Sequence, residues 1–362
     1  MDDKMKQTLN LDNLLVKNGP MCLIIEAHLS PVSGEDRFQP AGFPQIGHVI
    51  YDAPRGDNEV EKVCIVDSSA SMANHLESVC FSNTRDLALA DEIRGLPHVV
   101  CVTDNELTKE KSLAVTSTLK EGHRLASDYF LEGLINAERF RETLRKGFGI
   151  KEVKKDKTYF IYPENWWTIF ATIFKYDPNS LIHGVLFARE QIKISRMLTA
   201  HMEAFGARRV VSSGVKFDPL GKTTSGQPIF SVDEETARDI RAIFILDLAL
   251  LRSYGRDELG LNDKQKRMLL ELALWKINRI LSQPFLFRSN CRLQCNELSV
   301  RDEKGSYQNE LPVLDIRKAL DACGFKADEE SITKVYYAAA DLFKEGEAST
   351  GDTKTGNASD QR

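Results

Sequence analysis

Hydrophobic and polar positions follow two patterns along the chain, and together they predict a mixture of strands and helices. Short apolar runs bounded by glycine or proline are typical of buried strands, whereas apolar residues at helical spacing are typical of helices that cover a sheet. The runs that predict strands are residues 21–29, 62–66, 98–104, 183–188 and 285–298. The segments that predict helices are residues 68–77, 127–146, 192–205, 262–281 and 331–344. Residues 241–251 form a buried element whose type the pattern leaves open.

The order of these elements favours the α+β class. Strands and helices mix without the steady alternation of a doubly wound sheet. Residues 30–47 and 212–230 are rich in glycine, proline or small polar residues, which predicts a loop and a long loop or projecting hairpin. Residues 1–19 are expected to be a flexible N-terminus. Residues 345–362 contain no large apolar side chain, so we expect a disordered tail there.

Composition narrows the class of protein. With 362 residues, 42% hydrophobic and 28% charged, the chain can bury a core, which excludes a disordered chain and a disulfide-stapled mini-protein. The seven cysteines are an odd number, and Cys22, Cys64 and Cys101 lie in apolar runs, as expected of reduced thiols in the cytoplasm. The N-terminus lacks a signal-type apolar stretch, and the run from Ala242 to Leu251 is too short to cross a bilayer. We therefore expect a cytoplasmic protein without a membrane partner.

The net charge of −5 argues weakly against nucleic-acid binding, but the charge is unevenly distributed. Residues 139–157 hold eight basic and three acidic side chains, and residues 189–222 hold seven and three. Both runs contain aromatic residues, a mixture that can follow a phosphate backbone and stack bases. A solvated helix face is the commoner explanation of any single run. Two such runs favour a nucleic-acid surface.

Asp67, Ser69 and Ser71 form a D-x-S-x-S pattern directly after a hydrophobic strand. In von Willebrand factor A-type domains this spacing surrounds a Mg²⁺ ion, and oxygen ligands suit such an ion. A serine-rich helix N-terminus can instead attract a phosphate through its free N–H groups. Plain helix capping needs only one of the serines. The sequence leaves these three interpretations open.

Other motifs give no site. Gly221-Lys222-Thr223 lacks the glycine that a phosphate loop requires five residues before its Gly-Lys pair, because position 216 is lysine. Cys291 and Cys295 have no second pair of ligands at zinc-site spacing. His183 and His201 are lone histidines on apolar elements, where a buried, hydrogen-bonded ring is the usual case. We expect neither a metal nor another cofactor.

Several phrases, in order, resemble one family. The chain is similar to the backbone subunit of the type I-G (formerly I-U) CRISPR surveillance complex, a RAMP protein. The phrases that carry the resemblance are RFQPAGFPQIG (37–47), DSSASMANHLE (67–77), EGHRLASDY (121–129), DPNSLIHGVLFA (177–188), SSGVKFDP (212–219), FILDLALLRSYG (244–255) and FLFRSNCRLQCNEL (285–298).

The resemblance implies a modified RNA-recognition-motif (ferredoxin-like) palm over residues 20–344. A helical finger insertion at about 78–160 and a projecting thumb loop at about 212–232 would elaborate this palm. Such a subunit is not an enzyme. It polymerises along the CRISPR guide RNA (crRNA) and presents the guide for pairing with target DNA. The implied partners are the crRNA, target DNA through the guide, other copies of the chain, other effector subunits and the helicase-nuclease.

The resemblance also implies which residues contact RNA. The serines before the first palm helix would take a guide phosphate, and the thumb would displace a guide base. The implied residues are Arg37, Phe38, Gln39, Ser68, Ser69, Ser71, Asn74, His123, Arg124, Ser213, Gly214, Lys216, Lys222, Arg288 and Arg292. The family pattern has a glycine in the turn before Arg292, where this chain has Ser289-Asn290-Cys291. Asparagine tolerates a left-handed backbone, so the turn can survive.

Two alternatives remain at this point. One is the Mg²⁺-dependent interaction module that Asp67, Ser69 and Ser71 suggest. The other is an RNA-cleaving RAMP subunit, because related subunits of other CRISPR types carry a thumb aspartate and Asp218 lies in the corresponding loop.

Overall fold

The computed structural model describes most of the chain outside the long 211–233 segment and the two ends. The described residues are 8–32, 34–43, 47–56, 59–83, 87–104, 113–153, 158–160, 166–210, 234–256, 258–305, 307, 309–327 and 331–339. The predicted thumb loop and the predicted disordered tail lie outside these ranges.

The largest element is a seven-stranded sheet in which every pair of neighbouring strands is antiparallel. Its order is β23 (Phe285–Arg288), β24 (Cys291–Arg301), β1 (Cys22–Pro31), β20 (Asp239–Asp247), β17 (Leu198–Phe205), β6 (Glu59–Asp67) and β5 (Ile50–Gly56). Alternate residues of β1, such as Leu23 and Ile25, are fully buried, which is the period of two expected for a sheet with one covered face. The mixture of this sheet with helices confirms the α+β class.

A five-stranded sheet lies apart from the first and contains one parallel pair, β9 with β25. Its order is β10 (Leu113–Ser117), β9 (His98–Thr103), β25 (Ile332–Tyr336), β11 (Leu134–Ile135) and β12 (Glu138–Arg139). The smaller sheets are β18 (Arg208–Val210), β19 (Glu234–Thr236) and β2 (Arg37–Phe38); β15 (Val185–Phe187) with β16 (Ile192–Ile194); β13 (Lys151–Val153) with β14 (Thr158–Phe160); β3 (Gly42–Phe43) with β4 (Gly47–His48); β7 (Phe81–Asn83) with β8 (Ala88–Leu89); and β21 (Gly255–Arg256) with β22 (Leu259–Gly260).

Helices pack between and around the two larger sheets. They are α1 (Leu11–Leu15), α2 (Ser69–Ser78), α3 (Asp128–Leu131), α4 (Phe140–Phe148), α5 (Trp166–Tyr176), α6 (Pro178–His183), α7 (Leu248–Ser253), α8 (Asp263–Leu281) and α9 (Ile316–Ala322), with the 3₁₀ turns η1 (Asp91–Ile93) and η2 (Arg124–Ala126). The longest, α8, begins with a reciprocal capping box between Asn262 and Gln265 and buries Leu269, Ala273 and Ile277, as its sequence predicts.

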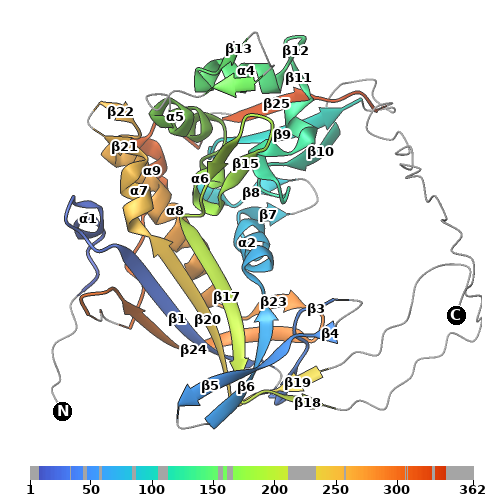
Figure 1. The fold of residues 1–362 in the computed structure, drawn as a ribbon, viewed down its shortest axis with the longest axis vertical. Coiled ribbons are helices and arrows are strands. Elements are labelled where there is room, and N and C mark those ends of the chain that lie inside the picture. The colour runs from blue at the N-terminus through green and yellow to red at the C-terminus, as the bar shows by residue number, and fades with distance from the viewer. Residues whose placement is uncertain are drawn as a thin grey trace, which may run out of the picture.

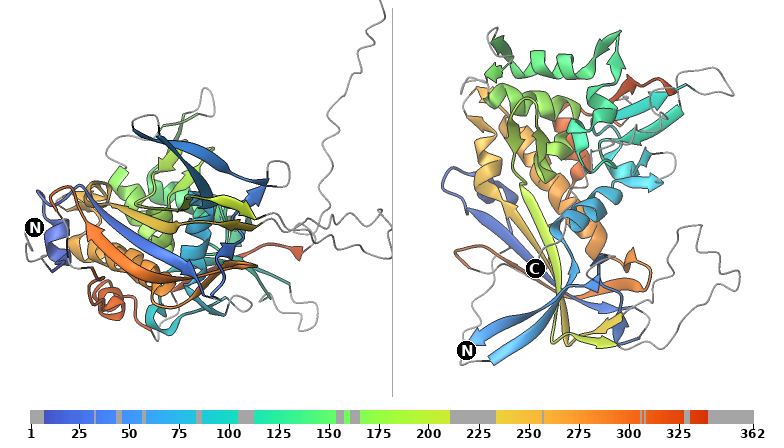
Figure 2. Two further views of the ribbon diagram at one scale, coloured as in Figure 1. Left: turned by 90° about the horizontal axis from the view of Figure 1, so that it is seen from below. Right: turned by 45° about the vertical axis from the view of Figure 1, so that its right-hand side comes forward.

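Figure 1 shows the seven-stranded sheet in the lower half of the molecule and the five-stranded sheet at the upper right, with α2 and α6 between them. Both helices pack against β17. The same separation is visible in the right-hand view of Figure 2, where β5 and β6 lie at the end opposite α4. The region between the two sheets therefore contains α2 and α6.

Two predicted helices are wrong, and a third is interrupted. Residues 192–205 form β16 and β17 instead, and β17 alternates strictly between buried and half-buried residues because it lies inside the large sheet. The expected helix at 331–344 is β25 as far as Tyr336, paired with β9. The single helix expected over 127–146 is divided into α3 and α4 by the β11–β12 hairpin, whose residues Asn136 and Ala137 have positive φ angles.

The strand expected over 285–298 is divided into β23 and β24, with Asn290 at a positive φ angle in the turn between them. Within the expected N-terminal segment 1–19, α1 buries Leu11 and Leu14. Residues 241–251, left open by their pattern, are the end of β20 followed by α7, which Asp247 caps. All seven cysteines are free thiols. Burial raises the pKa of Cys64 to about 12 and that of Cys101 to about 11, as expected of packing residues.

Candidate nucleic-acid interface

The N-terminus of α2 follows the buried strand β6 without an intervening loop. Ser68 is the N-cap, and its hydroxyl accepts a hydrogen bond from the backbone N–H of Ser71 (3.3 Å). Ser68, Ser69 and Ser71 are half-buried, and Asn74 is exposed one turn further along. One serine therefore satisfies the capping requirement, and the side chains of the other two are not needed for it.

Asp67, the last residue of β6, anchors this helix start to the β23–β24 hairpin. Its carboxylate accepts hydrogen bonds from the Arg288 guanidinium (2.7 Å) and from Nε2 of His75 (3.0 Å). Burial acts to raise the pKa of Asp67, but the hydrogen bonds from His75 and Ser71 and the charge of Arg288 outweigh it, so the pKa lies below its ordinary value. Arg288 also donates to the carbonyl oxygens of Val66 (2.9 Å) and Gln39 (3.4 Å).

This arrangement overturns the von Willebrand A-type interpretation. That fold places its metal at the edge of a parallel sheet, whereas β6 lies in a sheet that is antiparallel throughout. Arg288 and His75 both contact Oδ2 of the Asp67 carboxylate, whereas Oδ1 is buried and has no hydrogen-bond partner among the described residues.

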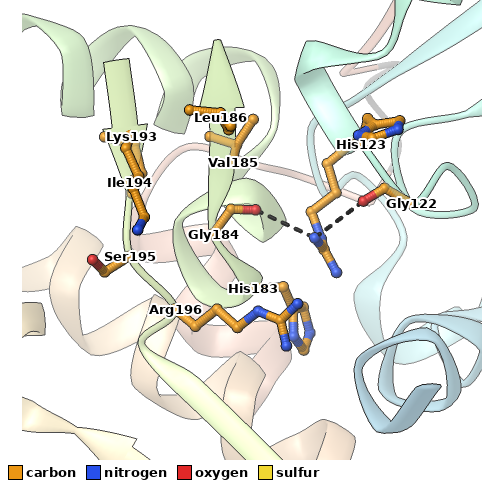
Figure 3. Close-up of a pocket in the computed structure, with 11 residues that line it drawn as sticks. Gly122, His123, His183, Gly184, Val185, Leu186, Lys193, Ile194, Ser195 and Arg196 are labelled. Atoms are coloured by element: carbon orange, nitrogen blue, oxygen red, sulfur yellow. Dashed lines mark hydrogen bonds between the residues drawn. The ribbon is translucent and has the colours of Figure 1, made fainter. Parts of the chain in front are cut away.

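A basic cleft of about 440 Å³ adjoins the start of α2. Three short segments line it: the η2 turn, the end of α6, and the β15–β16 hairpin with the residues after it (Figure 3). The lining residues are Gly122, His123, Arg124, His183, Gly184, Val185, Leu186, Lys193, Ile194, Ser195 and Arg196. None of these is acidic. Arg196 joins the cleft to the helix, because its guanidinium donates to the carbonyl oxygen of Ser69 (3.1 Å).

The cations of the cleft differ in whether their charge is already compensated. Arg124 is 6% exposed and forms a two-bond ion pair with Glu77 (2.7 and 3.0 Å). Lys193 is exposed and Arg196 is half-buried, and neither has an ion-pair partner among the described residues. The positive charge available to a ligand therefore comes from Lys193 and Arg196.

A buried chain of polar side chains supports the cleft from below. Glu77 accepts a hydrogen bond from the side-chain amide of Asn179 (2.6 Å), and the Asn179 oxygen accepts one from Lys276. Lys276, fully buried on α8, also contacts Nε2 of His183 (3.1 Å). Together with the Arg124–Glu77 pair, this chain fixes η2, α2, α6 and α8 relative to one another. Buried charges require such pairing, because an unpaired one is strongly destabilising.

Two backbone features set the shape of the cleft. Arg124 has a φ of +51°, a left-handed conformation that is strained for a residue with a side chain and is held here by its buried ion pair. Gly184 has a φ of +80°, and its carbonyl accepts from Arg124 (3.3 Å). A Cβ at position 184 would come within 2.9 Å of the Ile194 carbonyl oxygen and 3.1 Å of the Arg196 side chain. Glycine is therefore required for the close approach of Arg196.

The residues expected to contact RNA fall into several places. Gln39, Ser68, Ser69, Ser71 and Arg288 are brought together around the start of α2, and the backbone N–H of Gln39 also donates to the carbonyl of Asn290 (2.9 Å). His123 is exposed at the rim of the cleft, next to Arg124.

The remaining expected residues lie on the strands. Arg37 is half-exposed on β2 and pairs with Glu234 of β19 (2.8 Å), the strand that follows the 211–233 segment. Phe38 is 1% exposed in the core, so its ring cannot stack on a base in this conformation. Arg292 is exposed on β24. Ser213, Gly214, Lys216, Lys222 and the alternative nuclease residue Asp218 lie outside the described residues.

Sequence reasoning missed His183, Lys193, Ser195 and Arg196 as cleft residues. The basic run over residues 189–222 contains Lys193 and Arg196, and this was the available signal. His183 was expected to be a buried, hydrogen-bonded histidine. The structure confirms the burial and one hydrogen-bond contact, but Nδ1 has no partner among the described residues.

Comparison with known proteins identifies one matching family model. The family model described as CRISPR-associated protein GSU0053 (Cas_GSU0053) matches residues 23–209, just over half of the 362 residues. The matched segment runs from β1 into β18 and includes α2 and the whole cleft. No curated protein matches the chain. In the described part of the chain, no helix is long and apolar enough to span a membrane.

Proposed function

Because the chain belongs to the family of CRISPR-associated protein GSU0053, we propose that it binds the crRNA and forms the backbone of a type I-G CRISPR surveillance complex. Membership in this family gives the chain a role in a CRISPR system. The RNA ligand and the backbone role are the parts that we propose. They rest on the ordered phrases that resemble that subunit and on the chemistry of the basic cleft.

The cleft is the single observation that carries the RNA assignment. Its described lining contains Lys193 and Arg196 without ion-pair partners and no carboxylate. Arg196 connects it to the α2 N-terminus, where backbone N–H groups and the helix dipole favour a phosphate. Successive phosphates of one nucleic-acid strand could occupy the cleft and the α2 N-terminus together, which a single small anion could not do.

In this proposal the seven-stranded sheet with α2 and α8 is the palm, and the segment between β18 and β19 is the thumb. The proposed subunit is a scaffold rather than a nuclease, and sequence is selected by base pairing between the guide and target DNA. Its partners would be the crRNA, target DNA through the guide, further copies of itself, and the remaining effector subunits with their helicase-nuclease.

Co-expression with a CRISPR array and its neighbouring subunits tests the proposal. We expect a large particle with a raised absorbance ratio at 260 and 280 nm, and its nuclease-protected RNA should contain spacer sequence. A purified monomer without RNA would contradict the proposed function.

A thumb variant tests the resemblance separately. Replacing both Lys216 and Lys222 with glutamate should weaken RNA retention, because two positive charges become negative. If the double variant retains as much RNA as the wild type, residues 216 and 222 do not belong to an RNA-binding thumb, and the cleft remains the proposed RNA site.

A further inference from the structure

His183 presents an unusual group at the cleft, a buried ring nitrogen that has no partner among the described residues. The ring is 1% exposed and belongs to the cleft lining. Its Nε2 atom lies 3.1 Å from the ammonium of Lys276, whereas Nδ1 has no hydrogen bond to any described residue. Figure 3 shows that Arg196 and His183 lie on the same side of the cleft, and the charge of Arg196 acts on the His183 ring.

The contact with Lys276 determines which nitrogen carries the proton. An ammonium group can only donate hydrogen bonds, so Nε2 of His183 must accept. Burial, and then the positive charges of Lys276, Arg124 and Arg196, hold the pKa of His183 well below its usual value, so the ring is neutral. A neutral imidazole that accepts at one nitrogen carries its hydrogen on the other. Nδ1 is therefore an N–H donor.

We propose that this donor, together with Lys193 and Arg196, forms a subsite for one phosphate group of the RNA backbone at the floor of the cleft. Lys193 and Arg196 supply charge, and the Nδ1–H of His183 supplies a fixed neutral donor. A buried N–H without an acceptor is unfavourable, and a phosphate oxygen would satisfy it. The inference deepens the proposed function and rests on it.

The surroundings favour an RNA phosphate over a protein carboxylate. Arg196 of the cleft donates to the Ser69 carbonyl in the first turn of α2, so a second negative group further along the same chain could reach the N–H groups of that turn. RNA carries a charge at every nucleotide. An isolated Asp or Glu side chain would occupy either the cleft or the first turn of α2, but not both.

Affinity measurements on the full-length protein test the charged residues. The probe is a fluorescein-labelled single-stranded RNA followed by anisotropy over a range of salt concentrations. Lys193→Gln and Arg196→Gln should each raise Kd about tenfold, because each removes a charge-assisted contact. Each should also reduce the slope of log K against log salt by about 0.7 in magnitude. Lys318→Gln, an exposed lysine on α9 outside the cleft, is the matched control.

Nuclear magnetic resonance of ¹⁵N-histidine-labelled protein tests His183 directly. On addition of RNA, the Nδ1–H proton of His183 should shift downfield as it gains an acceptor. His98 is the matched control, because it is equally buried, also has an unpartnered ring nitrogen and lies outside the cleft. Inorganic phosphate and an oligoglutamate peptide are the comparison ligands.

The outcomes separate this inference from the proposed function. A shift of His183 but not His98 on adding RNA, lost in Lys193→Gln, supports the subsite. RNA binding that leaves His183 unmoved and Lys193→Gln unweakened overturns the subsite, while the guide-RNA proposal stands. A protein that binds no RNA overturns both. A His183 shift with oligoglutamate alone would then make the cleft a carboxylate site.

Discussion

Part of the charge around the cleft is already compensated by side chains that solvent barely reaches. Arg124 is the clearest case, because it was expected to contact RNA and its guanidinium is instead engaged by Glu77, which is 3% exposed. The ion pair fixes the η2 turn, whose N-cap is His123. The sequence could indicate that position 124 matters, but not that its partner lies 47 residues away.

Replacing Glu77 with glutamine should destabilise the fold strongly. The change removes the charge that compensates Arg124, and breaking a buried ion pair on one side typically lowers the free energy of unfolding by about 3–5 kcal/mol. The midpoint of urea unfolding measures the loss. Asp52→Asn is the matched control, because Asp52 pairs with Lys62 (3.2 Å) on an exposed surface and should change stability by no more than about 1 kcal/mol. Similar midpoints for both variants would contradict the structural role of the Arg124–Glu77 pair.

Asp177, buried at the start of α6, should make stability fall as the pH rises from about 4 to 6. Burial raises its pKa to about 6, so over this window the folded state keeps a proton that the unfolded state has released. The fall should be on the order of 2–3 kcal/mol. Asp177→Asn should remove most of this pH dependence and stabilise the protein at pH 7. Urea midpoints measured at half-unit pH steps test this, and an unchanged profile in Asp177→Asn would assign the titration to another group.

At the level of elements, the hydrophobic periodicity predicted a strand or helix correctly where the residues also have a propensity for that structure. The helix α8 combines helical spacing with a capping residue, and β1 follows a Gly-Pro pair with an apolar run. The strand β17 was mistaken for a helix because its inward residues are Leu198, Ala200, Met202 and Ala204, all strong helix formers. Burial inside the sheet overrides that propensity.

The strand β25 and the cleft show what local patterns cannot supply. The run Ile332–Tyr336 is rich in β-branched residues, but its partner β9 lies more than 200 residues earlier. The cleft likewise joins residues 122–124 to residues 183–196. Periodicity predicts that an element exists, but it does not identify which distant element packs against it. The resemblance implied His123 and Arg124 as contact residues, whereas neither the resemblance nor the periodicity pointed to His183 as their neighbour.

The turn between β23 and β24 gives a prediction at this scale. Asn290 has a left-handed φ of +56° and lies in the turn where the resemblance led us to expect a glycine, and its carbonyl accepts a hydrogen bond from the backbone N–H of Gln39. Asn290→Val should lower the free energy of unfolding by about 1–2 kcal/mol, because a β-branched residue is strained there. Asn290→Gly should be tolerated. Gln294→Val, at an exposed extended position of β24, is the control and should change stability by less than about 0.5 kcal/mol. Equal effects of the two valine substitutions would mean that the turn can relax.

At the level of the whole molecule, an acidic chain presents a local basic cleft. The net charge of −5 opposes general attraction to RNA, so binding should depend on the few groups in the cleft and at the α2 N-terminus. Contacts of this kind read the phosphate backbone and carry no sequence information. Affinity should therefore vary little among single-stranded RNAs of equal length and unrelated sequence.

If copies assemble along a guide, the mass of the complex should grow in proportion to the length of the RNA. Each copy of a scaffold covers a fixed number of nucleotides. RNAs of one, two and three times a minimal length should therefore bind protein copies in the ratio 1:2:3. Light scattering coupled to size-exclusion chromatography measures the protein mass on each RNA. The Lys193→Gln variant should require lower salt to reach the same masses, since it weakens every copy equally, whereas Lys318→Gln should match the wild type. One copy per RNA at every length, with the cleft variants still weakened, would leave an RNA-binding subunit that does not polymerise.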